Sequence, residues 1–124
     1  MKKRISIFFI FLGMLCLLAS CSMNENYAAK IRKANEKNTP YTYAEVIKKL
    51  GDPTEHRTSS GTKTYPFNTD NFTGFAVWYV GYNSEEEYNE AYNAGKKVKS
   101  MLITFEDGYA VNAMYSLSLI HIWR

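Results

Sequence analysis

Cys21 is the residue whose type and position point most directly to chemistry. It follows Leu18-Ala19-Ser20, a run that ends in two small side chains. A cysteine thiolate is a good nucleophile, and small residues before it leave room for a peptidase to cut the chain. This arrangement makes Cys21 the candidate for a covalent modification beside a cleavage point.

The residues before Cys21 supply the matching context. A positive cluster, Met1-Lys2-Lys3-Arg4, precedes an apolar run of about 14 residues, which is the pattern of a secretory signal. The run is shorter than the roughly 20 residues that span a bilayer. Leu18–Cys21 resembles the bacterial lipobox, in which the thiol is diacylglycerylated. We therefore expect residues 1–20 to be a lipoprotein signal peptide and the lipid to hold the protein on the extracytoplasmic face of the cell membrane. An ordinary signal peptide with an incidental cysteine is the alternative.

The positive charge of the chain is concentrated before Cys21. Lys2, Lys3 and Arg4 are three of the 15 basic residues, and none of the 12 acidic residues precedes Cys21. The segment left after cleavage therefore has 12 residues of each sign. This balance removes the argument from composition for a nucleic-acid partner or an electrostatic membrane patch. Cys16 is discarded with the signal, so no thiol remains for a disulfide.

His56 is the one histidine after Cys21 if the C-terminal residues are set aside. A zinc site needs three or four ligands, and a general base needs a nucleophile or a substrate pocket. We favour a solvated surface histidine, because the hydroxyls near it belong to a polar loop. These hydroxyls are those of Thr54, Thr58, Ser59 and Ser60.

The acidic run Glu85-Glu86-Glu87 raises the question of a cation site. Its place at the start of a predicted helix explains the charges, since acids favour the positive end of the helix dipole. No Asp-x-Asp-x-Asp-Gly loop follows, and the glycines are scattered rather than grouped into a phosphate loop. We expect no metal, no cofactor and no catalytic residues, and so a protein that is not an enzyme.

Aromatic residues are the remaining candidates for contact with a partner. The chain has ten tyrosines, and the commoner use of such residues is core packing. An exposed part of an aromatic cluster would still be the best contact surface. The candidate contact patch consists of Trp78, Tyr79, Tyr82, Tyr88 and Tyr92.

Three helices are expected after Cys21. Residues 21–26 are polar, and we interpret them as a short lipidated tether that is followed by an α+β domain over 27–116. Apolar positions at helical spacing predict a first helix over 27–35.

Two capping boxes mark the other helices. Thr42 and Glu45 have the Thr-x-x-Glu spacing at the start of a helix that ends at Leu50, before Gly51. Ser84 and Glu87 repeat this spacing and predict a helix that ends near residue 94.

The strongest strand signal is Phe-Ala-Val-Trp-Tyr-Val-Gly-Tyr over 75–82. It is apolar on both faces and predicts a central strand. A short edge strand is expected over 55–59, and Tyr65-Pro66-Phe67 is interpreted as an extended edge segment because proline cannot donate to a ladder.

Asp107-Gly108 predicts a tight hairpin between strands over 98–106 and 109–115. In the second of these strands, Val111, Ala113 and Tyr115 are expected on one face.

The last residues have a different origin in our interpretation. Residues 117–122, Leu-Ser-Leu-Ile-His-Ile, resemble the peptide translated from a transposon-end adapter used in sequencing libraries. We expect 117–124 to be a non-native tail, with a genuine apolar tail as the alternative.

One pattern joins the predicted helices to the last hairpin. It consists of Tyr27-x3-Ile31, Tyr41-Thr42-Tyr43-x2-Val46-x3-Leu50-Gly51-x-Pro53-Thr54 and Ile103-Thr104-Phe105-x-Asp107-Gly108-x-Ala110-Val111. The pattern resembles small Gram-positive lipoproteins of unknown function that are similar to β-lactamase-inhibitor-protein-like and SmpA/OmlA (BamE-like) domains. The resemblance implies two helices packed on one face of a small antiparallel sheet of about four strands. The helix over 84–95 departs from it as an insertion between strands, and the final strand is short.

The resemblance supplies no catalytic residues and implies a binding or scaffold module. The function we expect is that of a membrane-anchored envelope lipoprotein whose domain binds an envelope or secreted protein. The alternative is a glycan- or peptide-binding module that uses the aromatic patch. A hydrolase that uses His56 is the third hypothesis.

Overall fold

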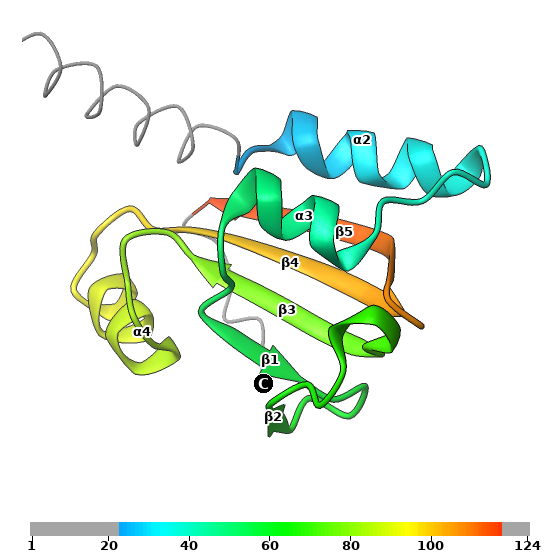
Figure 1. Ribbon diagram of the computed structural model, residues 1–124. Helices are drawn as coiled ribbons and strands as arrows, with labels where there is room; N and C mark the ends of the chain where they lie inside the picture. The colour runs from blue at the N-terminus through cyan, green and yellow to red at the C-terminus, as the bar shows by residue number, and fades with distance from the viewer. Residues whose placement is uncertain (1–22, 118–124) are drawn as a thin grey trace, which may run out of the picture.

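The computed structural model describes residues 23–117, which form an α+β domain around one antiparallel sheet of five strands (Figure 1). The strand order is β2-β1-β3-β4-β5. The fold class is as predicted, with one strand more than expected; Cys21, the rest of the signal region and residues 118–124 lie outside the described range. The elements are α2 (Glu25–Glu36), α3 (Tyr43–Leu50), β1 (Glu55–Arg57), β2 (Lys63–Thr64), the 3-10 helix η1 (Thr69–Asn71), β3 (Gly74–Tyr79), α4 (Glu85–Asn93), β4 (Lys99–Glu106) and β5 (Tyr109–Leu117).

The helices lie on opposite faces of the sheet. Helices α2 and α3 cover one face, where their apolar side chains pack against Ala76, Trp78 and alternate residues of β4. Helix α4 covers part of the other face through Tyr88 and Ala91. No helix within residues 23–117 is long and apolar enough to cross a bilayer.

Helix α2 begins earlier than the sequence indicates. The Asn24 side chain caps it by accepting a hydrogen bond from the Tyr27 amide at 3.0 Å. Met23 packs against the core beside the helix. The predicted tether over 21–26 is therefore wrong at its C-terminal part, because the domain already begins at Met23.

Helix α3 has the predicted capping box. Thr42 accepts from the Glu45 amide, and the Glu45 carboxylate accepts from the Thr42 amide. Val46 and Leu50 are buried under it. The helix ends at Leu50, and Gly51 follows as its C-cap with a φ of 81°, which suits a residue without a Cβ.

Strand β1 is not the edge strand that the sequence predicts. A hairpin closed by the Thr58 amide and the Thr62 carbonyl at 2.8 Å folds β2 back along it. His56 therefore pairs with Ala76 on one side and Thr64 on the other. The two-residue β2 forms the edge instead.

Strand β3 is central, as predicted, and alternates between two buried faces. Ala76 and Trp78 face α2 and α3, whereas Val77 and Tyr79 face α4. All six of its residues except Phe75 are buried.

The cap of α4 differs from the predicted capping box in one half. Ser84 accepts from the Glu87 amide at 3.2 Å, as expected. The Glu87 carboxylate accepts from the amide of Asn83, one residue before the cap.

The β4–β5 hairpin turns at Asp107 and Gly108, which both have positive φ. A bulge follows: Thr104 pairs with Asn112, but Phe105 pairs with Ala110. Val111 is the extra residue, so Ala110 and not Val111 joins Ala113 in the core. The predicted face of this strand is wrong at that residue. Strand β5 continues to the first residue of the predicted tail, Leu117, which pairs with Lys99.

Side chains hydrogen-bond to the backbone at the middle of β5, on the strand edge that faces away from β4. The Arg32 guanidinium donates to the Ala113 carbonyl at 2.7 Å, and the Asn112 side chain accepts from the Ala113 amide at 2.9 Å. Both backbone groups of Ala113 are therefore satisfied by side chains and not by another strand.

Candidate functional site

The five residues of the predicted aromatic patch do not form one exposed surface. Trp78 is 2% exposed and lies under α2 and α3. Tyr79 and Tyr88 lie on the opposite face, where their rings are 4.6 Å apart and buried. Only Tyr82 and Tyr92 are partly exposed, at the margin of the α4 cluster. The sheet separates Trp78 from the tyrosines because strand neighbours point to opposite faces.

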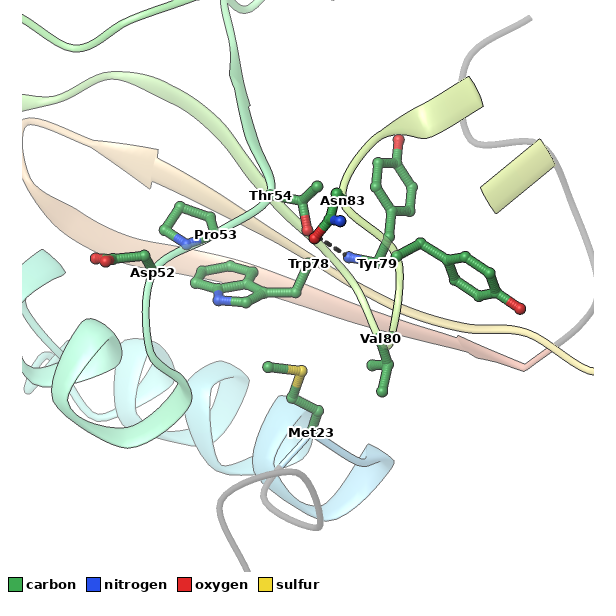
Figure 2. A pocket seen from close by; sticks show the side chains of 10 residues that line it. Met23, Asp52, Pro53, Thr54, Trp78, Tyr79, Val80 and Asn83 are labelled. Carbon is green, nitrogen blue, oxygen red and sulfur yellow. Dashed lines mark hydrogen bonds between the residues drawn. The ribbon is translucent and has the colours of Figure 1, made fainter. Parts of the chain in front are cut away.

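A pocket of about 440 Å³ lies beside Trp78, at the end of the sheet where β3 ends (Figure 2). The Trp78 indole donates to the Gly51 carbonyl at 3.1 Å, and Thr54 accepts from the Tyr79 amide at 3.0 Å. Asp52 is the one charged residue among the described residues that line it. The lining residues are Met23, Asp52, Pro53, Thr54 and residues 78–83.

His56 is half-buried and not the surface histidine that the sequence favours. Its Nε2 lies 2.6 Å from the Tyr43 hydroxyl, and its ring packs edge-on against Phe72 at 5.3 Å. Burial lowers the pKa of His56, and Asp52 opposes this in part. Burial, then Asp52, raises the pKa of Tyr43.

The neutral imidazole and the neutral phenol that these pKa shifts favour share one hydrogen bond between His56 Nε2 and the Tyr43 hydroxyl, and the tautomer of the imidazole sets which of the two groups donates. The partner of His56 is this phenol and not a serine in a cleft, the arrangement that would support a hydrolase.

An ion-pair network joins β1 to α4 on the other face of the sheet. The Arg57 guanidinium contacts Glu55 at 3.4 Å and makes a close ion pair with Glu85. The Glu55 and Arg57 side chains are only 5% and 13% exposed. In the acidic run 85–87, the Glu85 carboxylate therefore pairs with the Arg57 guanidinium. Within the described residues, no three histidine, cysteine or acidic side chains are grouped so as to hold a metal ion.

The two most exposed aromatic residues within residues 23–117 lie in the loop between β2 and η1. The side chains of Tyr65 and Phe67 are 81% and 107% exposed. They border a hollow of about 490 Å³ whose other walls are neutral and polar or aromatic. The residues that line the hollow are Thr58, Thr64, Tyr65, Pro66, Phe67, Asn68, Asn71, Phe72 and Thr73.

The whole connection from β2 to β3, which includes η1 and which we call the aromatic loop (residues 65–73), contacts the β4–β5 hairpin through its last two residues. The Gly108 amide donates to the Phe72 carbonyl at 2.9 Å, and the Asp107 amide donates to the Thr73 hydroxyl at 3.0 Å. The Gly108 carbonyl in turn accepts from the Tyr43 amide at 2.8 Å. The exposed rings are therefore carried on a supported loop.

The sequence pattern does not distinguish Tyr65 and Phe67 as contact residues, because Pro66 between them indicates an extended edge segment. The available signal was an aromatic pair around a proline between two polar runs, 54–64 and 68–74. Such a pair has no periodicity that would place it on the buried face of a helix or strand.

Comparison of the chain with protein-family models, with curated proteins and with solved structures gives no match.

Proposed function

We propose that the protein is an envelope lipoprotein, held in the membrane by lipid on Cys21, whose α+β domain binds another envelope or secreted protein through the aromatic loop. The lipobox pattern supports the attachment. The resemblance to BamE-like and β-lactamase-inhibitor-protein-like domains supports a binding or scaffold role.

The exposure of Tyr65 and Phe67 is the observation that carries the binding proposal. Burial of a large aromatic side chain is favourable by roughly 2 kcal/mol, and a ring that stays in water does not gain this free energy. Aromatic residues are also enriched among those that dominate binding energy at protein interfaces. A supported loop with two such rings loses little conformational entropy on binding.

The position of the loop favours a protein over the lipid bilayer as its partner. Met23, two residues after Cys21, lines the pocket where β3 ends, whereas Thr73 lines the hollow where β3 begins. At about 3.3 Å per residue, β3 separates these ends by roughly 17 Å. Figure 1 shows the loop between β2 and η1 on the far side of the sheet from the start of α2.

The experiment is affinity capture from envelope extracts with the full lipidated chain. A Tyr65→Ser/Phe67→Ser variant should capture about tenfold less of a defined partner, the loss expected when central interface residues are truncated. Met114→Ser is the matched control, because Met114 is 55% exposed on β5, away from the loop. Equal capture by all three proteins would contradict the proposal.

A glycan is the second candidate partner, and the neutral lining of the hollow favours it. Asn68, Asn71 and Thr73 can hydrogen-bond sugar hydroxyls while Phe67 packs against a sugar ring. Calorimetric titration with soluble cell-wall fragments tests this candidate. Heat that disappears in Phe67→Ser would support it, and no heat at millimolar fragment would rule it out.

The attachment is tested separately. Cys21→Ala should leave the protein unprocessed or release it from the membrane fraction. Unchanged incorporation of labelled fatty acid into this variant would show that the lipid is elsewhere.

A further inference from the structure

The chain between the proposed lipid and the folded domain is too short to let the domain turn freely. Met23 packs against the core, and Asn24 caps α2. Only Ser22 lies between Cys21 and Met23, so two residue steps join them, and an extended chain gains at most about 3.6 Å per step. The folded part of the protein therefore begins within roughly 7 Å of the residue that carries the lipid.

The end of the sheet next to Met23 has the side chains that suit a membrane interface. Val80 is partly exposed and its amide bonds to the Lys99 carbonyl at 3.0 Å, so the two residues are neighbours across β3 and β4. Tyr82 follows in the same turn. Lys96 and Lys97 are exposed in the connection from α4 to β4, which Figure 1 shows at this end, and Lys99 is exposed at the first position of β4.

We propose that this end surface, made of Val80, Tyr82, Lys96, Lys97 and Lys99, lies against the bilayer that holds the lipid of Cys21, so that the domain has one fixed orientation. Tyrosine has an apolar body and a polar tip, and lysine can bury its stem while its ammonium reaches the headgroups. The aromatic loop then points away from the membrane, toward partners in the envelope.

Local charge decides which kind of bilayer tests this contact. Asp52 lines the pocket at this end, and Glu86 and Glu87 are exposed at the start of α4, shortly after Tyr82. These three acids offset the three lysines of the end surface, and Lys48 and Lys49, in the last turn of α3 just before Asp52, add two positive charges. The contact is therefore tested on a zwitterionic bilayer, on which attraction to anionic lipid does not contribute.

The inference rests on the proposed lipid attachment, and the experiment separates the two. After processing, Cys16 is removed and Cys21 is blocked, so one introduced cysteine can be labelled uniquely with a fluorophore. Lys97→Cys reports on the end surface, and Asp70→Cys in η1, within the aromatic loop, is its matched control; both residues are exposed. The lipidated proteins are placed in phosphatidylcholine vesicles that contain a headgroup-quencher lipid.

The label at residue 97 should be quenched several-fold more than the label at residue 70. Equal quenching, or stronger quenching at residue 70, on protein that floats with the vesicles would overturn the orientation and leave the attachment intact. Protein that does not float would overturn the attachment as well. Tyr82→Cys and Phe67→Cys form a second pair, so the result does not depend on the folding of one variant.

Discussion

His56 illustrates how a residue that looks solvated in the sequence acquires a defined environment. Its ring lies between Tyr43 and Phe72, 6.0 and 5.3 Å from their ring centroids. Tyr43 comes from the start of α3 and His56 from β1, so one hydrogen bond connects the helix to the sheet. A protonated ring has a donor on both nitrogens, so the Tyr43 hydroxyl could then serve only as the acceptor of this hydrogen bond.

The lowered pKa of His56 predicts a pH dependence of stability. The unfolded chain, with the ordinary value of 6.5, binds a proton at a higher pH than the folded protein does. The stability contributed by neutral His56 is therefore complete above pH 6.5 and is lost as the pH falls from there toward the lower folded pKa. Thermal unfolding should show a lower Tm at pH 5.5 than at pH 8.

The matched variant for this prediction is His56→Phe, which keeps a ring between Tyr43 and Phe72 but cannot titrate. Its Tm should change less between the two pH values than that of the parent protein. An equal change in both proteins would show that other groups cause the dependence.

At the scale of elements, the hairpin tip determines whether the aromatic loop keeps its place. A Cβ on Gly108 would meet the backbone of Asp70, whereas a Cβ on Gly95 would meet nothing within 4 Å. Both glycines have a φ of 82°. Gly95→Ala should lower the free energy of unfolding by about 1 kcal/mol, the cost of a positive φ for alanine. Gly108→Ala should lower it by about 2–4 kcal/mol, because the aromatic loop must also move.

Urea unfolding of the two alanine variants measures this difference, and the capture experiment adds a functional comparison. Gly108→Ala should weaken partner capture while Gly95→Ala should not. If the two variants are equally stable, the hairpin does not support the loop in the way described.

The Arg57 network predicts that removal of the arginine lowers the free energy of unfolding more than removal of the Glu85 charge does. Arg57→Met leaves Glu55 buried, with Lys63 as its other contact at 3.8 Å, and should cost about 2–4 kcal/mol. Glu85→Gln should cost less, because it leaves Arg57 its contact with Glu55. Adding Glu55→Gln to Arg57→Met should recover part of the lost free energy of unfolding, because the buried carboxylate is then replaced by a neutral amide. Chemical denaturation of the four proteins tests the order.

Local signals in the sequence predict the elements well, and contacts between distant segments explain the differences. Thr42 with Glu45, and Asp107 with Gly108, are short-range patterns whose structure is determined by neighbouring residues. The bulge at Val111 and the position of β1 depend on strand partners, which periodicity does not identify. For the same reason, alternation along β3 predicts two faces but not that α4 covers the tyrosines on one of them.

At the scale of the whole molecule, the two ends of the sheet have different surfaces. The pocket end carries Met23, the start of the folded domain, and the other end carries the hairpin tip and the aromatic loop. The proposals for membrane contact and for partner binding therefore occupy separate surfaces. A substitution in the aromatic loop should change partner capture without changing vesicle flotation.

The capped edge of β5 gives a prediction about self-association. Arg32→Met frees the Ala113 carbonyl, and Asn112→Val frees its amide. The double variant should form aggregates at concentrations at which the parent protein stays monomeric, as light scattering can measure. Lys33→Met, an exposed change on α2, is the control for lost charge. Identical scattering from both variants would mean that the edge needs no protection.

The proposed lipid attachment would make the protection of this strand edge more important. Molecules confined to a plane and held in one orientation present their sheet edges at the same height above the lipid. Such alignment raises the frequency of edge-to-edge encounters far above that of tumbling molecules, and an open edge strand is a template for strand pairing. The Arg32 and Asn112 side chains, which hydrogen-bond to the backbone of Ala113, would then decide whether a densely populated membrane holds separate domains or growing β-sheet assemblies.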